Sequence, residues 1–275
     1  MSGSDSISPT AHYTGHVWGR HGLSDPHLAT VEGRVLFDSL RPLMALSRTL
    51  GGGSLEPYLL SRHAAIDALL ERAIEDRGVS QVIEVACGLS PRGWRFAERH
   101  GDRLTYVETD LPPMAARKRE ALERMGSVSD HHRVEDLDAL ADSGPASLAA
   151  VASGLDPDAG LAIVTEGLLG YLPLDAVREI WTRFATTLSG FRAGVYFSDL
   201  PLGGMQPPQV RAFRVLLSAF VRGRVHLHFE TAPEAESALR AAGFASATLH
   251  SAPSVVPETR GPGSGWAHII EASSR

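Results

Sequence analysis

The chain of 275 residues has a single cysteine, Cys87, and no excess of positive charge. One cysteine cannot form an internal disulfide, which favours a reducing compartment. A net charge of -6 gives no electrostatic footprint for nucleic acid or an anionic membrane. The longest apolar runs, such as Val215–Val221, fall far short of the roughly 20 residues that span a bilayer, and no signal-peptide pattern opens the chain. We therefore expect a cytoplasmic protein with neither nucleic-acid nor membrane partners.

The complete dinucleotide fingerprint G-x-G-x-x-G is also missing. Where it would stand, the series reads Glu84-x-Ala86-x-Gly88-x-Ser90, so one of the three spaced glycines remains. The second glycine of the fingerprint lets the backbone approach a pyrophosphate. Its loss, with no Tyr-x-x-x-Lys pair in the chain, counts against a nicotinamide-dependent oxidoreductase. An acidic residue before a loosened glycine loop is typical of proteins that bind S-adenosyl-L-methionine, which has no pyrophosphate; a structural tight turn is the alternative.

What the chain does contain is a strand–loop–helix pattern at Gln81–Arg95. The short apolar run Val82–Ala86 predicts a strand buried on both faces, and Gly88 follows in a turn that leads into a helix. A second predicted strand, Leu104–Thr109, runs into Asp110. An acidic side chain at that point can accept hydrogen bonds from both hydroxyls of a ribose. Together the two units predict a nucleoside-binding half of an open sheet.

Strand and helix patterns alternate along the rest of the chain, which predicts a Rossmann-like seven-stranded α/β sheet with helices on both faces and an antiparallel last strand. The basic helix from Met114 carries Arg117, Lys118 and Arg119, which we interpret as a solvated face. Thr231 and Glu234 form a predicted capping box. The further predicted strands are His131–Leu140 (in part), Leu161–Thr165, Gly194–Phe197, Ala245–Ser251 and Trp266–Ala272, and the further helices are Asp175–Leu188, Gln209–Val221 and a last one that ends at Gly243.

The N-terminal third has a different character. Residues 1–9 read as a disordered tail, 10–77 as a helical cap or lid, and 78–275 as the sheet domain. Arg41-Pro42 is expected to interrupt the helices of the cap, and Gly51–Gly53 to form a loop. The stretch Thr10–Gly22 is rich in aromatic and histidine side chains without helical periodicity, so a packed surface segment and a lid are both open. Its histidines lack metal-ligand spacing, and we predict no metal site.

Three motifs, EVACGLSPRGWRF, YVETDLPPMAARKR and TEGLLGYLP, resemble the leucine carboxyl methyltransferase-like family, which includes a bacterial branch of polyketide-type O-methyltransferases. They occur in the family's order across Arg62–Pro173. The resemblance implies S-adenosyl-L-methionine (SAM) as cofactor, and S-adenosyl-L-homocysteine as product. It places Arg62 on the cofactor carboxylate, Gly88 against its methionine portion, Asp110 on the ribose, Asp136 and Leu137 around the adenine, and Glu166 on the amine. Glu84, Ala86, Leu111 and Gly167 complete the expected cofactor set.

The sequence departs from the family's usual pattern at Ala86 and Ser90, where its loop is less rich in glycine. The N-terminal stretch also differs from that of the eukaryotic phosphatase-recognising enzymes, which counts against a protein C-terminus as substrate. From the residues alone, Arg62 in the middle of a predicted helix is expected to be solvated. Its cofactor role is therefore an expectation from the resemblance only.

Methyl transfer from a sulfonium needs alignment and desolvation more than a strong base. A carboxylate acceptor is already ionised at neutral pH, whereas a phenol gains from a histidine base. The expected function is a SAM-dependent O-methyltransferase for a small-molecule carboxylate or hydroxyl in natural-product metabolism, with a homodimer left open. The alternative is a protein that binds SAM without methyl transfer. Candidate catalytic residues are Tyr13, His63 and Tyr171, and candidate substrate-binding residues are Trp18 and Arg20.

Overall fold

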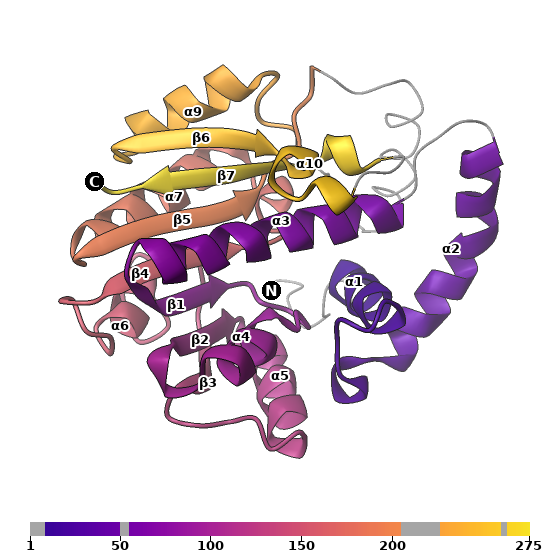
Figure 1. The fold of residues 1–275 in the computed structure, drawn as a ribbon, viewed down its shortest axis with the longest axis horizontal. Helices are drawn as coiled ribbons and strands as arrows, with labels where there is room; N and C mark the ends of the chain where they lie inside the picture. Colours follow the sequence, from indigo (N-terminus) through magenta and orange to yellow (C-terminus); the bar gives the residue numbers. More distant parts are fainter. Residues whose placement is uncertain (1–8, 50–54, 205–225, 260–262) are drawn as a thin grey trace.

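The structure, a computed structural model, describes residues 9–49, 55–204, 226–259 and 263–275. One seven-stranded sheet has the order β3-β2-β1-β4-β5-β7-β6 (Figure 1). All neighbours are parallel except β7, which is antiparallel to both β5 and β6. The predicted α/β sheet and its antiparallel last strand are therefore confirmed. The strands are β1 Val79–Val85, β2 Thr105–Asp110, β3 His132–Asp136, β4 Gly160–Thr165, β5 Ala193–Asp199, β6 Ser246–Ser251 and β7 His268–Ser273.

Helices cover both faces of the sheet (Figure 1). One layer consists of α6, α7 and α9, and the other of α3, α4 and α10, while α5 packs against β3. The bounds are α1 Pro9–Arg20, α2 Val31–Thr49, α3 Leu55–Asp76, α4 Arg92–His100, α5 Pro112–Arg124, α6 Leu148–Ala152, α7 Leu174–Ser189, α9 Ala232–Ala241 and α10 Ala252–Val255. Short 3-10 turns include η1 Pro26–Leu28, η3 Leu169–Tyr171 and η5 Ser264–Trp266.

The central strands are apolar on both faces because both faces are covered. Ile83 and Val85 of β1 lie in the core under α7, whereas Val82 lies in the core under α3. Trp181 of α7 is fully buried between the layers. Burial of each such large side chain contributes roughly 1.5–3 kcal/mol. Because side chains alternate between the two covered faces, the register of β1 is fixed. The position of its carboxyl end, and of the loop that follows, is fixed with it.

The N-terminal helices divide between the sheet and a separate small core. Most of α3 packs on the sheet, but its start joins α1 and α2 in an apolar cluster that includes Tyr13, Val17 and Phe37. Figure 1 shows α1 beyond the carboxyl ends of the parallel strands. The predicted interruption at Arg41-Pro42 is wrong, since the backbone of α2 stays helical through Pro42. Proline removes one backbone donor from a helix, but its fixed φ of about -65° is itself helical, so α2 can contain it at the cost of that hydrogen bond.

The cap of α9 matches its sequence signature in part. Thr231 accepts a hydrogen bond from the Glu234 N–H, as predicted, while the Glu234 carboxylate accepts from the N–H of Glu230 instead of Thr231. The predicted helix Gln209–Val221, the glycine loop at 51–53 and the tail at 1–8 lie outside the described residues. Within the described ranges, no helix is long and apolar enough to cross a membrane.

Candidate functional site

The loop after β1 is held by the carboxylate that ends β2. Asp110 accepts hydrogen bonds from the N–H groups of Gly88 and Leu111, each at 2.8 Å. Gly88 has a positive φ of 53°, which a glycine adopts without strain. The pKa of the Asp110 carboxyl is raised above its usual value, mainly because the side chain is partly buried. The loop that the sequence predicted to contact a ligand is thus fastened directly to the predicted ribose-binding carboxylate.

Ala86 keeps a glycine-like backbone although it is not glycine. Its φ of 56° is the one positive value at a non-glycine residue in the described part of the chain. The left-handed region costs an L-residue about 1–2 kcal/mol. Strain of this kind gathers at ligand-binding sites, where the surrounding structure imposes it. The sequence departure at this position therefore leaves an alanine in a backbone conformation that glycine adopts without strain.

We expect Ala86→Gly to raise the free energy of unfolding by up to about 1 kcal/mol, because relief of the left-handed strain exceeds the added chain entropy of glycine. Urea unfolding followed by circular dichroism measures it. Ala242→Gly is the control, because the half-buried Ala242 at the C-cap of α9 has a φ of -78°. A loss of stability in Ala86→Gly would contradict the strain argument.

A buried ion-pair cluster lies where β4 and β5 end. Arg62, in the middle of α3, donates to Glu166 at 2.8 Å and to Asp199 at 3.2 Å. Its side chain is 9% exposed, so the expectation of a solvated arginine is wrong. The Gly167 N–H donates to Asp199 at 2.6 Å. Histidine and arginine neighbours hold the pKa of Glu166 well below its usual range despite burial, so Glu166 is anionic at neutral pH.

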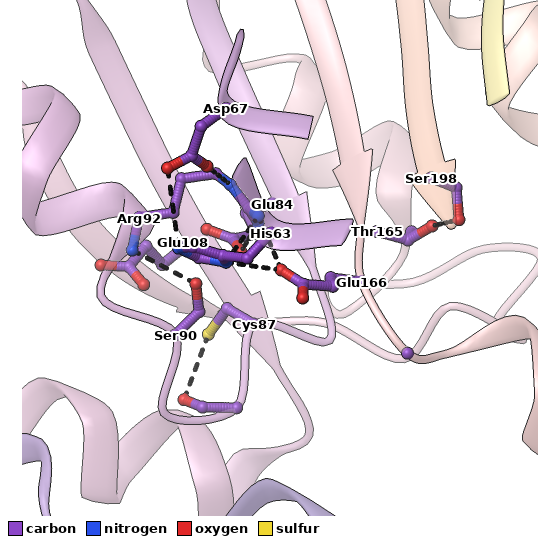
Figure 2. A network of polar contacts seen from close by, with 12 residues as sticks. His63, Asp67, Glu84, Cys87, Ser90, Arg92, Glu108, Thr165, Glu166 and Ser198 are labelled. Carbon is purple, nitrogen blue, oxygen red and sulfur yellow. Dashed lines mark hydrogen bonds and ion pairs between the residues drawn. The ribbon is translucent and has the colours of Figure 1, made fainter. Parts of the chain in front are cut away.

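At the centre of the cluster is Arg92, a residue that sequence reasoning did not single out. Its guanidinium is fully buried and donates to three carboxylates: Asp67 at 2.6 Å, Glu84 at 2.7 Å and Glu166 at 2.6 Å. His63 lies 2.8 Å from the same Glu166 oxygen (Figure 2). The same Nδ1 of His63 lies 2.9 Å from the Arg92 guanidinium. Arg92 thereby joins α3, β1 and the loop after β4 at one point.

Glu84, predicted to bind the cofactor, is instead turned into this cluster. Its side chain is 1% exposed, and its two oxygens accept from Arg92 and from the Tyr106 hydroxyl at 2.7 Å each. The structure therefore places Glu84 beneath the glycine loop as a support for Arg92. Its role toward a cofactor stays a prediction.

A second buried cluster supports the loop from α5. Lys118 is fully buried, forms an ion pair with Glu108 at 2.5 Å and donates to the carbonyl of Ser90 in the loop. His132 lies 2.7 Å from the other oxygen of Glu108. The prediction of a solvated basic face is therefore wrong for Lys118, because the buried carboxylate of Glu108 on β2 faces the helix and pairs with it. Gly93 admits this packing, since a Cβ there would lie 2.4 Å from the Glu108 carboxyl carbon.

The predicted adenine-side residues lie on the other side of Asp110. The Leu137 N–H donates to the Asp110 carbonyl at 2.8 Å, and its side chain is buried. Asp136 is exposed, 3.5 Å from Arg119, and Leu111 is 44% exposed. Both lie at the carboxyl ends of β2 and β3, as the prediction requires of residues that contact a nucleobase.

The predicted catalytic and substrate residues are spread over two regions. His63 and Trp18 come together, with ring centroids 4.9 Å apart. Tyr13 packs in the core of the cap, where burial raises its pKa to about 12, so its phenol is neutral at neutral pH. Arg20 stacks on Phe37 with its guanidinium 4.6 Å from the ring centroid. Tyr171 is in η3, five residues after Glu166, and is 36% exposed.

These groups lie at one edge of the sheet, and their charges indicate which kind of ligand could bind there. A cation and an anion, Arg62 and Glu166, neutralise each other at one end, and a carboxylate bonded to the glycine loop lies at the other. Such an arrangement fits a ligand with a zwitterionic end and a vicinal diol. The signal for Arg92 lay in the loop motif itself, but its partners are scattered from position 67 to 166 and only the fold brings them together.

The leucine carboxyl methyltransferase family model matches residues 41–185, more than half of the chain. The chain belongs to this family, which confirms the resemblance seen in its motifs. A Mycolicibacterium smegmatis protein named "Putative S-adenosyl-L-methionine-dependent methyltransferase" is 39% identical over 105 residues, 38% of this chain and 34% of that protein. A Streptomyces coelicolor protein of the same description is 34% identical over 138 residues, 50% of this chain and 47% of that protein. The chain thus spans about a third to a half of the curated relatives it matches.

Solved structures share the fold at low sequence identity. A protein described as a putative methyltransferase of Thermobifida fusca has a TM-score of 0.67 at 13% identity, over 98% of this chain and 96% of that one. A DUF574-family protein of Streptomyces avermitilis has a TM-score of 0.64 at 14% identity, over 96% of each chain. These likenesses confirm the predicted Rossmann-like fold class.

Proposed function

We propose that this protein is a SAM-dependent methyltransferase that transfers the methyl group to an oxygen of a small molecule, a carboxylate or a hydroxyl. Family membership supports the class of reaction. The names of the curated relatives support SAM as the cofactor. An oxygen acceptor from natural-product metabolism, and a cytoplasmic location, are the finer parts of the proposal and rest on the motifs and the lone cysteine.

One observation carries the cofactor assignment: Arg62 and Glu166 form a buried ion pair at the same sheet edge as Asp110 and the Gly88 loop. In the proposed complex, Arg62 holds the carboxylate of the amino-acid end and Glu166 holds its ammonium. Asp110 accepts from the ribose hydroxyls. The two charges that pair with each other without ligand then pair with the matching charges of the ligand, so none is left buried and uncompensated.

The cofactor supplies an electrophilic methyl group on a sulfonium. The residues of this chain bind and orient it, because displacement at carbon depends on alignment of the acceptor oxygen with the departing sulfur. Glu166 is kept in place by Arg92 and His63, and the loop by Lys118. A carboxylate acceptor needs no base; a hydroxyl acceptor needs one.

Isothermal titration of the purified protein with SAM, S-adenosyl-L-homocysteine and NAD tests the cofactor. We expect micromolar affinity for the first two ligands and none for NAD. Asp110→Ala should weaken the binding of both by about 100-fold, since a charged acceptor of hydrogen bonds is lost. Asp102→Ala, an exposed acid in the turn after α4, is the matched control. Binding of NAD alone would overturn the proposal.

Transfer of labelled methyl from SAM to carboxylic acids and phenols separates an enzyme from a protein that only binds the cofactor. Methylated product in either class supports the proposed function, and its pH profile separates the two acceptors. A rate that rises with pH as a hydroxyl is deprotonated indicates a base, whereas a flat profile indicates a carboxylate. Tight binding with no product from any acceptor would favour the alternative of binding without turnover.

A further inference from the structure

The N-terminal helix α1 lies directly on the glycine loop. A Cβ at Gly15 would lie 3.4 Å from the Leu89 Cβ, and one at Gly88 would lie 3.5 Å from the Ala11 Cβ. These are ordinary van der Waals separations, so the helix and the loop lie in contact. α1 precedes the family match, which begins at residue 41. The helix is therefore part of the site by position but is not part of the matched segment.

Trp18 is the residue of α1 that reaches the ion-pair cluster. It is 5% exposed, and its ring lies 4.9 Å from that of His63, which contacts Glu166. Its indole Nε1–H is buried and has no hydrogen-bond acceptor among the described residues. A buried donor without a partner costs about 1–3 kcal/mol, and tryptophan N–H groups usually have one when buried. A bound ligand that accepts a hydrogen bond from this N–H would account for a buried donor without a partner at this place.

We propose that α1 forms one wall of the cofactor site, with the Nε1–H of Trp18 donating a hydrogen bond to the carboxylate of the bound amino-acid moiety. This inference rests on the proposed function. At that end of SAM, the ammonium and the sulfonium cannot accept a hydrogen bond, so the carboxylate is the only acceptor for an indole N–H. Arg62, next to His63 in α3, supplies the charge for the same carboxylate, and Trp18 fixes its orientation.

Trp18→Phe tests the inference because it removes the N–H and keeps an aromatic ring. Binding of three ligands is measured by titration: SAM, S-adenosyl-L-homocysteine and 5′-methylthioadenosine, which has the adenosine and the sulfur but no amino-acid carboxylate. We expect affinity for the first two to fall about 10- to 100-fold, the effect of a hydrogen bond to a charged group. Affinity for methylthioadenosine should stay within about twofold of wild type.

The melting temperature of Trp18→Phe is a second readout. If the N–H of Trp18 only stabilised the fold, the substitution would lower this temperature. Without ligand, Trp18→Phe should melt at the wild-type temperature or above, since an unsatisfied buried donor is removed. Trp94→Phe, in the separate cluster under α5, is the matched control and should leave all three affinities unchanged.

Three outcomes overturn the inference. An equal loss for all three ligands would mean that the ring only shapes the site, and no loss for any would mean that the N–H does not donate to the ligand. If the wild-type protein binds none of the three, the proposed function fails and the inference fails with it. Normal wild-type binding with an unchanged variant removes the inference alone.

Discussion

Arg92→Met is expected to lower the free energy of unfolding by about 3–5 kcal/mol, the usual effect of removing one partner from a buried ion-pair cluster. Arg92 is fully buried and donates to Asp67, Glu84 and Glu166. Methionine fills much of the same volume, so the loss comes from three carboxylates that keep only their remaining partners, and the side chains of Glu84 and Glu166 are buried. Urea denaturation at neutral pH, analysed by linear extrapolation, gives the value.

Arg95→Met, on the same helix, is the matched control. The Arg95 side chain is 28% exposed and lies 3.1 Å from Asp67, so its loss should cost less than about 1 kcal/mol. Arg92→Lys should remain well below wild type, because an ammonium cannot donate in the three fixed directions of a guanidinium. Equal effects of the Arg92→Met and Arg95→Met substitutions would show that the cluster adds no more to stability than a surface pair.

Much of the fold could be predicted because its cause is local. The apolar runs at Val82–Ala86 and Leu161–Thr165 predict buried strands, and the structure has strands there with ends shifted by at most three residues. The order of elements then permits few topologies, and the observed one is the common choice. Pro42 shows the limit of such reasoning, since it lies inside α2 where the local rule predicts an interruption of the helix.

Only part of the candidate site could be predicted from the sequence, because local patterns do not show which distant residues the fold brings together. Asp110 and Gly88 could be found because they follow strands at the edge where ligands bind. Arg92 and Lys118 could not, because basic residues on a helix are ordinarily solvated and their burial depends on carboxylates that arrive from other strands. Glu84 and Glu108 are direct neighbours in the register of β1 and β2. Two adjacent buried carboxylates on one face of a sheet are stable only when cations neutralise them, and here Arg92 of α4 and Lys118 of α5 do so.

The two clusters give the site a rigid base, which bears on how the cofactor would bind. Glu166 is fixed by Arg62, Arg92 and His63 before any ligand arrives. A preorganised carboxylate loses little conformational entropy when it accepts an ammonium, so more of the interaction appears as affinity. In the proposed complex Arg62 would exchange one partner for another, whereas Arg92 would keep its own. The proposal therefore assigns a positioning role to Arg92 and a binding role to Arg62.

Glu166→Gln is expected to lower the free energy of unfolding by about 3 kcal/mol at pH 7, with a loss that shrinks as the pH falls. The native pKa of Glu166 is well below its ordinary value of 4.5. A carboxyl with a depressed native pKa adds its full stability above the unfolded value and loses it as the pH falls toward the native value. The wild-type advantage should therefore be constant from pH 7 to about 5.5 and decrease below about 4.5.

Urea unfolding of both proteins at pH 7, 5.5, 4.5 and 3.5 measures this difference. The difference between the two proteins is the informative quantity, because Glu84 is present in both. Burial raises the pKa of Glu84, so its contribution to stability changes with pH in the opposite direction to that of Glu166. Glu179→Gln, with its side chain 65% exposed, is the control and should show a small difference that does not vary with pH. A Glu166→Gln difference that stays constant down to pH 3.5 would contradict this argument, because it requires the native pKa of Glu166 to equal the unfolded one. The neighbouring cations would then not stabilise the carboxylate that the proposed function assigns to the ammonium.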